Sequence, residues 1–98
     1  MKMSDLEGQI WIDGSFCDWK EAKIHILTHT LHYGTGVFEG VRAYETNQGP
    51  AIFRLKDHTD RLFNSAKLIG MEIPFSPEIL MKAQRDTVKE NKLKNAYI

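Results

Sequence analysis

The stretch from Leu31 to Tyr44, which reads LHYGTGVFEGVRAY, constrains the fold of this chain more than any other. It opens as a polar turn, passes two closely spaced glycines, and from Val37 follows the two-residue period of a β-strand. Alternation places Val37, Glu39, Val41 and Ala43 on one face of the predicted strand, and Phe38, Gly40, Arg42 and Tyr44 on the other.

The second face of this predicted strand combines groups that suit a small anion with an apolar tail. Phe38 offers an aromatic wall, Gly40 leaves bare backbone, and Arg42 adds a guanidinium. A half-buried strand that uses its glycine for close packing explains the same pattern. Periodicity alone therefore leaves both interpretations open.

Length and charge limit the size and the partners of the fold. The chain has 98 residues, enough for one small domain, and 42% of them are hydrophobic, enough for a modest core. Thirteen basic and 13 acidic residues give zero formal net charge, so nothing predicts a nucleic-acid or membrane-surface partner. The same balance gives little electrostatic protection against self-association.

The N-terminus and the single cysteine bear on where the protein works. Residues 1–8 are polar, and we expect a flexible arm there rather than a secretory signal. Cys17 has no partner for an internal disulfide, which fits a reducing compartment. No apolar segment approaches the roughly 20 residues that a membrane-spanning helix needs. We therefore expect a cytoplasmic location.

Turn and capping residues place the other elements. Asp13-Gly14 predicts a hairpin of residues 9–12 and 15–19, and the turn formers at 45–50 predict a second hairpin onto residues 51–53. Thr28 and Ser76 suit helix N-caps, and Gly70 suits a helix end. We expect helices at residues 28–32, 56–69 and 77–91, a short strand or extended segment at 22–27, and the start of a strand at 95–98.

These elements predict an α/β (α+β-like) domain over residues 9–98, in which two helices pack on a mostly antiparallel sheet. The first long helix carries a core stripe at helical spacing, formed by Leu55, Leu62, Ala66 and Ile69.

Three segments together resemble the N-terminal signature of branched-chain amino-acid aminotransferases. They are LHYGTGVFEGVRAY, then GPAIFRLKDHTDRLFNSAK, then NAYI, in the family's order and spacing. These enzymes are pyridoxal-phosphate proteins of the class IV aminotransferase group, with fold type IV. The resemblance runs from about residue 10 to residue 98. It implies that residues 9–98 form the small N-terminal domain of a larger enzyme.

The resemblance also implies a reaction. The parent enzyme would move an amino group between L-leucine, L-isoleucine or L-valine and 2-oxoglutarate in a ping-pong cycle. D-amino-acid aminotransferases and aminodeoxychorismate lyases share the fold, but Tyr33-Gly34 and the FEG stretch at 38–40 resemble the branched-chain pattern better. The parent would be a homo-oligomer, at least a dimer, because the counterpart of Tyr33 reaches the neighbouring subunit's site.

Site residues follow from the same resemblance. Arg61 would bind the cofactor phosphate, for which a guanidinium fork is well suited; its spacing alone fits a surface pair with Asp57 as well. Phe38, Gly40 and Tyr97 would line the substrate site with Tyr33, and Arg42 is a further substrate-binding candidate on the same face. An apolar pocket separates substrates by only about 1–3 kcal/mol per methylene, so several related amino acids should be accepted.

No catalytic residue is expected within this chain. The family's Schiff-base lysine, and the carboxylate that pairs with the pyridine nitrogen, come from a C-terminal domain, and none of the nine lysines here lies in the family's lysine motif. The chain ends at Ile98, just before an arginine that the family uses for substrate recognition. We therefore expect the fragment alone to be inactive.

Two alternatives come from other classes of protein. The chain could be a non-catalytic interaction module that kept this fold and lost the enzyme. It could also bind a metal ion through His25, His29 and His32, which would share a face if they lay on one continuous helix.

Overall fold

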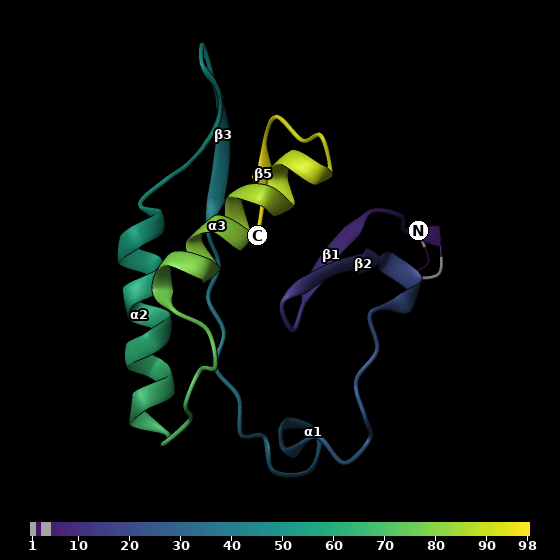
Figure 1. Ribbon diagram of the computed structural model, residues 1–98, viewed down its shortest axis with the longest axis vertical. Coiled ribbons are helices and arrows are strands. Elements are labelled where there is room, and N and C mark those ends of the chain that lie inside the picture. The colour runs from purple at the N-terminus through teal and green to yellow at the C-terminus, as the bar shows by residue number, and fades with distance from the viewer. Residues whose placement is uncertain (1, 3–4) are drawn as a thin grey trace.

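The computed structural model describes residue 2 and residues 5–98, which form two small antiparallel sheets and three α-helices (Figure 1). Residues 1, 3 and 4 of the expected N-terminal arm lie outside the described residues. Gly8, the last residue of that arm, accepts a backbone hydrogen bond from the amide of Trp19 at 2.9 Å. The arm is therefore tied to the first hairpin at its C-terminal end.

The first hairpin is formed as predicted. Strand β1 (Gln9–Ile12) pairs antiparallel with β2 (Ser15–Asp18), and a 3₁₀ turn, η2 (Trp19–Glu21), follows. Asp13 and Gly14 both have positive φ angles, 50° and 102°, as a two-residue hairpin turn requires.

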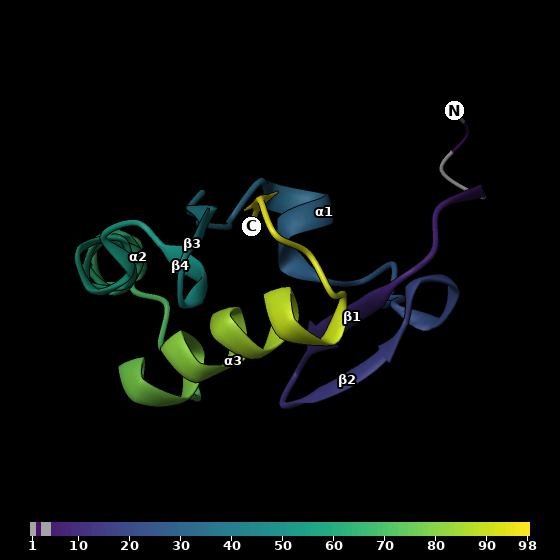
Figure 2. The same cartoon turned by 90° about the horizontal axis from the view of Figure 1, so that it is seen from above.

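The hairpin is attached to the third helix, α3 (Pro77–Glu90), which lies beside it in Figure 2. Asn91 caps this helix, accepts a hydrogen bond from the Gln9 amide at 2.8 Å, and donates one to the Gln9 carbonyl at 2.9 Å. Trp11 packs edge-on against Phe75, with ring centroids 5.1 Å apart. One amide side chain and one aromatic pair thus join the N-terminal hairpin to the far end of the chain.

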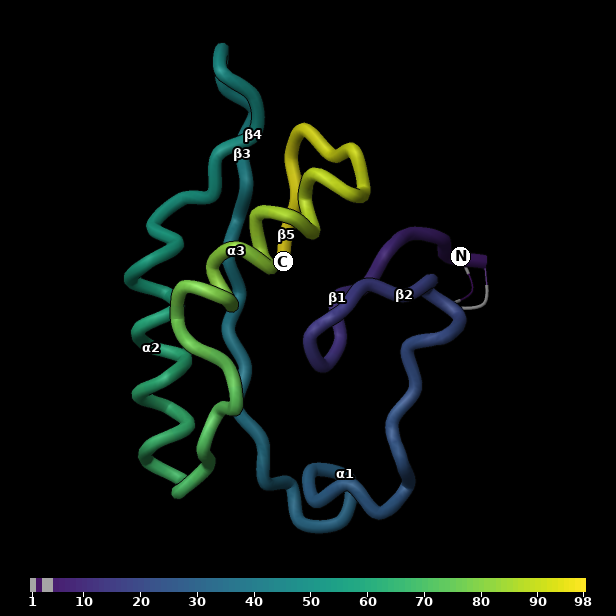
Figure 3. The backbone as a smooth tube through the Cα atoms, in the orientation of Figure 1, coloured from purple at the N-terminus to yellow at the C-terminus, as the bar shows by residue number. Residues whose placement is uncertain are grey.

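Residues 22–41 form a long arc that carries the short helix α1 (His29–Tyr33) away from the sheets and the long helices (Figures 1 and 3). The helical turn and its end at Gly34, with φ of 67°, were predicted correctly. The cap was not, because the Thr28 hydroxyl donates to the His25 carbonyl at 2.6 Å instead of accepting from the helix. Residues 22–27 contain no strand.

The main sheet has the strand order β4 (Gly49–Ile52), β3 (Arg42–Thr46), β5 (Ala96–Tyr97), with both pairs antiparallel. Strand β3 begins at Arg42, so the prediction of a strand from Val37 was too long. The reason is the pairing between β3 and β5. Its last backbone hydrogen bonds join Val41 and Ile98, at 2.9 and 2.8 Å, and residues before Val41 have no strand partner there.

The predicted alternation nevertheless holds through this segment. Val41 and Ala43 are 2% and 1% exposed, whereas Phe38 is 87% exposed. The inward face packs toward helix α2 (Leu55–Leu68) and α3. The buried apolar core consists of Val41, Ala43, Leu55, Ala66, Ala83 and Val88.

Both long helices begin and end within a residue or two of their predicted bounds. The Ser76 hydroxyl caps α3 by accepting from the Ile79 amide at 3.2 Å, as expected. Ile69, predicted to be core, is 45% exposed because α2 ends at Leu68. Thr59 is buried instead, and its hydroxyl accepts from the Gln84 amide of α3 at 3.2 Å.

No helix in the described part of the chain is both long and apolar enough to cross a membrane.

Candidate cofactor and substrate site

Arg61 on α2 forms a two-pronged ion pair with Glu39. Its Nε donates to Oε2 and its Nη2 donates to Oε1, each at 2.6 Å. His58 lies one helical turn before Arg61, and its Nδ1 is 3.1 Å from the same Oε1. The Gly40 amide donates to that oxygen as well, at 3.3 Å. The Glu39 carboxylate is therefore the meeting point of helix α2 and the segment that leads into β3.

The pairing of Arg61 with Asp57, left open by the sequence, is wrong. Asp57 accepts instead from Arg54 Nε at 2.7 Å, and Asp60 accepts from Lys56 at 2.7 Å. Both acidic side chains in the first half of α2 already have cations of their own. Glu39 is thus the partner of Arg61.

This cluster keeps the carboxylate ionised. The hydrogen bonds from Arg61, and then that from His58, lower the pKa of Glu39 from 4.5 to about 2. The same interaction raises the pKa of Arg61. The two halves differ in exposure, since the Glu39 side chain is 11% exposed and the Arg61 side chain 67%. The Glu39 carboxylate is therefore covered by protein, whereas the Arg61 guanidinium is the open half of the pair and faces solvent.

Gly40, Arg42 and Tyr97 come together on the outward face of the main sheet. Arg42 and Tyr97 are direct register partners, and the guanidinium lies 5.6 Å from the centre of the Tyr97 ring. A β-carbon on Gly40 would collide with the phenol oxygen and lie only 2.8 Å from Cζ of Tyr97. The space left by the missing side chain is therefore filled by a phenol, where the sequence had suggested open room for substrate.

Phe38 and Tyr33 are placed differently. Phe38 lies on the same outward face by alternation and is 87% exposed. Tyr33 ends α1 on the arc, is 75% exposed, and contacts the rings of His29 and His32 at centroid distances of 5.6 and 6.0 Å. The structure thus brings Gly40, Arg42 and Tyr97 together and leaves Tyr33 apart from them.

The three histidines do not share a helical face. His29 and His32 lie in α1, but His25 precedes the helix, where its Nδ1 accepts from the Leu27 amide at 3.0 Å. Among residues 2 and 5–98, no group of three histidine, cysteine or acidic side chains is arranged to hold a metal ion. The continuous helix on which the metal alternative depended is absent from this segment.

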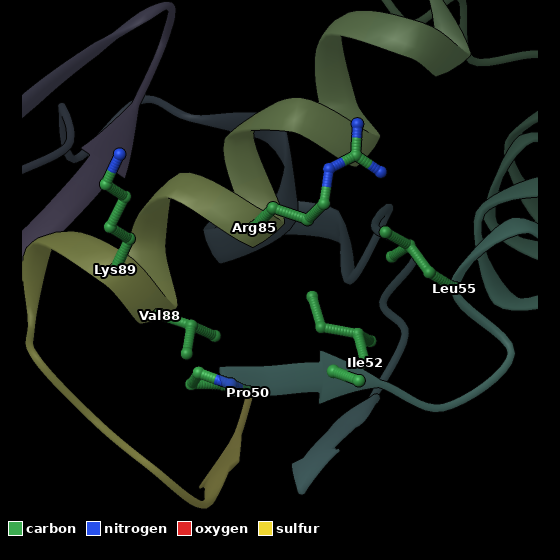
Figure 4. Close-up of a pocket in the computed structure, with 7 residues that line it drawn as sticks. Pro50, Ile52, Leu55, Arg85, Val88 and Lys89 are labelled. Atoms are coloured by element: carbon green, nitrogen blue, oxygen red, sulfur yellow. The ribbon is translucent and has the colours of Figure 1, made fainter. Parts of the chain in front are cut away.

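A cavity of about 560 Å³ lies between β4 and α3, away from these candidates. Pro50 and Ile52 of β4 and Val88 of α3 point toward one another across it (Figure 4). None of the residues predicted for cofactor or substrate lines it.

Sequence reasoning missed Glu39 as the partner of Arg61. One signal was available: Glu39 is the acidic member of an inward face that is otherwise apolar. A carboxylate on such a face needs a cation or several donors near it. Its position in the alternation therefore pointed to a charged partner, although not to which one.

The sequence and the fold match a known enzyme family. A family model described as amino-transferase class IV matches residues 36–98, and the chain belongs to this family. The match agrees with the resemblance seen in the three sequence segments and with the predicted fold class.

Individual relatives narrow the likeness to one branch. The chain is 58% identical over all 98 residues to the branched-chain-amino-acid aminotransferase of Pseudomonas aeruginosa, and covers 32% of that protein. It is 45% identical over 89 residues, or 91% of its length, to the enzyme of the same name from Escherichia coli, of which it covers 29%. The chain therefore spans about a third of the length of the curated relatives that it matches.

Solved structures agree. The branched-chain amino acid aminotransferase of Thermoproteus uzoniensis, a thermophilic archaeon, with norvaline superposes with a TM-score of 0.87 at 44% identity. That alignment covers 93% of this chain and 31% of the other. A further branched-chain amino acid aminotransferase, complexed with N-(5′-phosphopyridoxyl)-L-glutamate, gives a TM-score of 0.91 at 54% identity, over 94% of this chain and 31% of that one.

Proposed function

We propose that the protein containing this chain is a pyridoxal-phosphate-dependent branched-chain aminotransferase. It would transfer the amino group between L-leucine, L-isoleucine or L-valine and 2-oxoglutarate. The observation that carries this proposal is the 58% identity, over the whole chain, to an enzyme of that name. Bound pyridoxal phosphate would supply the electron sink for the reaction.

The open half of Arg61 fits the cofactor's phosphate. A guanidinium has five N–H donors, and Glu39 takes two of them, from Nε and Nη2. The remaining donors lie on Nη1 and Nη2, on a side chain that is 67% exposed, and His58 Nδ1 lies 3.4 Å from Nη2. This end of the guanidinium can bind two oxygens of a phosphate dianion at once. We assign Arg61 to phosphate binding on that basis.

The outward face of the main sheet fits the substrate. Phe38 supplies an exposed apolar wall, and the Tyr97 phenol and the Arg42 guanidinium supply a donor and a positive charge beside Gly40. A branched aliphatic side chain with an anionic group needs both kinds of contact. We assign Phe38, Gly40, Arg42 and Tyr97 to this site.

We also propose that the protein works as a homo-oligomer, at least a dimer, with Tyr33 at the neighbouring subunit's site. The arc carries several large exposed apolar side chains, which a partner surface would cover. They are Ile24, Ile26, Leu27, Leu31, Tyr33 and Phe38, between 58% and 87% exposed.

The single cysteine, Cys17, which is unpaired, supports a cytoplasmic location.

The Schiff-base lysine would lie outside this chain, of which residues 9–98 form the small N-terminal domain. A lysine that condenses with an aldehyde needs a lowered pKa. Lys56 shows the opposite, because Asp60 raises its pKa, and Lys82 and Lys94 pair with Asp86 and Glu45. These three lysines of the nine are thus engaged in surface ion pairs and are poor candidates for the Schiff base.

The intact protein tests this function. We expect activity with L-leucine, L-isoleucine and L-valine as donors to 2-oxoglutarate, and none with D-alanine or aminodeoxychorismate. A preference for either of the latter would move the protein to another branch of the family. Incubating the 98-residue chain with pyridoxal phosphate, followed by borohydride reduction and peptide mapping, should label no single lysine stoichiometrically.

A further inference from the structure

We infer that Glu39 is a positioning residue for the cofactor's phosphate: it holds the side edge of the Arg61 guanidinium so that the other edge is presented to the phosphate. This inference rests on the proposed role of Arg61. It adds a second residue, one that never touches the ligand, and assigns a specific geometry to the pair.

Glu39 uses both of its oxygens to hold one edge of the Arg61 guanidinium. Glu39 Oε2 accepts from Nε and Oε1 accepts from Nη2, both at 2.6 Å, so the pair is the side-on, two-pronged arrangement. This leaves Nη1 entirely free of Glu39. A guanidinium gripped along one edge cannot rotate about its long axis without breaking both bonds. Its free edge therefore has one orientation rather than many.

Glu39 is itself held in place. Besides Arg61, its Oε1 lies within hydrogen-bonding distance of His58 Nδ1, at 3.1 Å, and of the Gly40 amide, at 3.3 Å. Only 11% of the Glu39 side chain is exposed. The carboxylate thus has donors from α2 and from its own backbone segment, and it can serve as a fixed support for an exposed arginine.

A competing interpretation predicts the opposite sign. If Glu39 merely occupied Arg61 until phosphate displaced it, removing the carboxylate would strengthen phosphate binding. Electrostatics alone gives the same expectation, because a negative charge near a phosphate dianion is repulsive. Weaker binding that is confined to the phosphorylated ligand after removal of the carboxylate therefore indicates lost orientation. The direction of the change decides between the two.

The experiment measures ligand affinity by calorimetry on the cofactor-free intact protein. The ligands are pyridoxamine 5′-phosphate and pyridoxamine, which differ by the phosphate. We expect Glu39→Gln to weaken pyridoxamine 5′-phosphate binding about 10-fold or more, the range seen when a residue that orients a ligating group is removed. Pyridoxamine affinity should stay unchanged. Asp57→Asn, which breaks the other arginine pair of α2, is the matched control and should change neither affinity.

Two further variants make the result decisive. Glu39→Asp keeps the charge but is too short to reach both nitrogens, so it should also weaken phosphate binding; it carries the test if Glu39→Gln does not fold. In an Arg61→Ala background, Glu39→Gln should have no additional effect.

Each other outcome has a separate meaning. Tighter phosphate binding in Glu39→Gln, unchanged binding, or equal losses for both ligands would overturn the positioning role. An additional loss in the Arg61→Ala background would overturn it as well. If Arg61→Ala itself leaves the preference for the phosphorylated ligand intact, the proposed phosphate role of Arg61 fails, whatever Glu39 does.

Discussion

The phenol of Tyr97 occupies the space where Gly40 has no side chain, and a β-carbon at that position would lie 2.8 Å from Cζ of the ring. Tyr97 lies in β5, Gly40 lies just before the neighbouring strand β3, and Arg42 of β3 lies against the same ring. A side chain added at Gly40 would therefore contact the Tyr97 ring first.

The first prediction concerns Gly40→Ala. The methyl group would push the Tyr97 ring aside, and since Tyr97 is 69% exposed the ring can move without disturbing the core. We expect kcat/KM for L-valine and L-isoleucine to fall about 10- to 100-fold, the cost of a misplaced positioning group. The melting temperature should change little. Full activity, or a large loss of stability, would contradict this relationship.

The second prediction concerns acid stability. The pKa of Glu39 is about 2 in the folded protein against an ordinary value of 4.5, so folding favours its ionised form. The resulting stabilisation is complete above pH 4.5 and is lost as the pH falls toward 2. The melting temperature of the cofactor-free protein should therefore exceed that of Glu39→Gln by a margin that narrows below pH 4.5. A margin independent of pH would contradict the charged pair.

The third prediction concerns Asn91→Ala. The substitution removes the amide that bonds both backbone groups of Gln9 and also the Thr87 carbonyl, at 2.8 Å. We expect the local opening free energy of the first hairpin to fall by about 1–3 kcal/mol, because backbone groups lose their partners. Amide hydrogen exchange of residues 9–18 measures it. Asn64→Ala, on the exposed side of α2, should leave that exchange unchanged.

The fourth prediction concerns the arc. Leu31 lies on α1 and is 58% exposed, so Leu31→Glu would place a charge in the proposed subunit contact. We expect subunit association to weaken by about 2 kcal/mol, or roughly 30-fold, as measured by sedimentation of the intact protein. Leu68→Glu is the control, since Leu68 is 87% exposed on α2, away from the arc. Equal effects of both variants would rule out a specific contact at α1.

Local chemistry explains which parts of the fold were predictable. Asp13-Gly14 and Ser76 each act through bonds or angles within a few residues, and both elements form where the sequence placed them. Alternation also predicted that Val41 and Phe38 lie on opposite faces, and one is buried and the other exposed.

The rest depends on distant partners. The start of β3 is set by its hydrogen bonds to Ile98, 57 positions beyond Val41 in the sequence, and no pattern near Val37 predicts it. The partner of Arg61 was predictable only as an acidic residue. Asp57 was the nearer choice, and it is taken by Arg54. Spacing along the helix therefore did not identify the partner of Arg61, because Arg54 competes for Asp57 and leaves Arg61 to pair with Glu39.

The link between Gln9 and Asn91 also sets an order of events during synthesis. The β1–β2 hairpin can close by itself in about 1–10 μs once it emerges from the ribosome. Its docking partner comes 82 residues later, which corresponds to roughly 4–16 s of translation at about 5–20 residues per second. Until Phe75 and then Asn91 have been made, the hairpin lacks the two contacts that hold it in the folded protein. The nascent chain is thus most vulnerable to chaperone capture or aggregation before Asn91 appears.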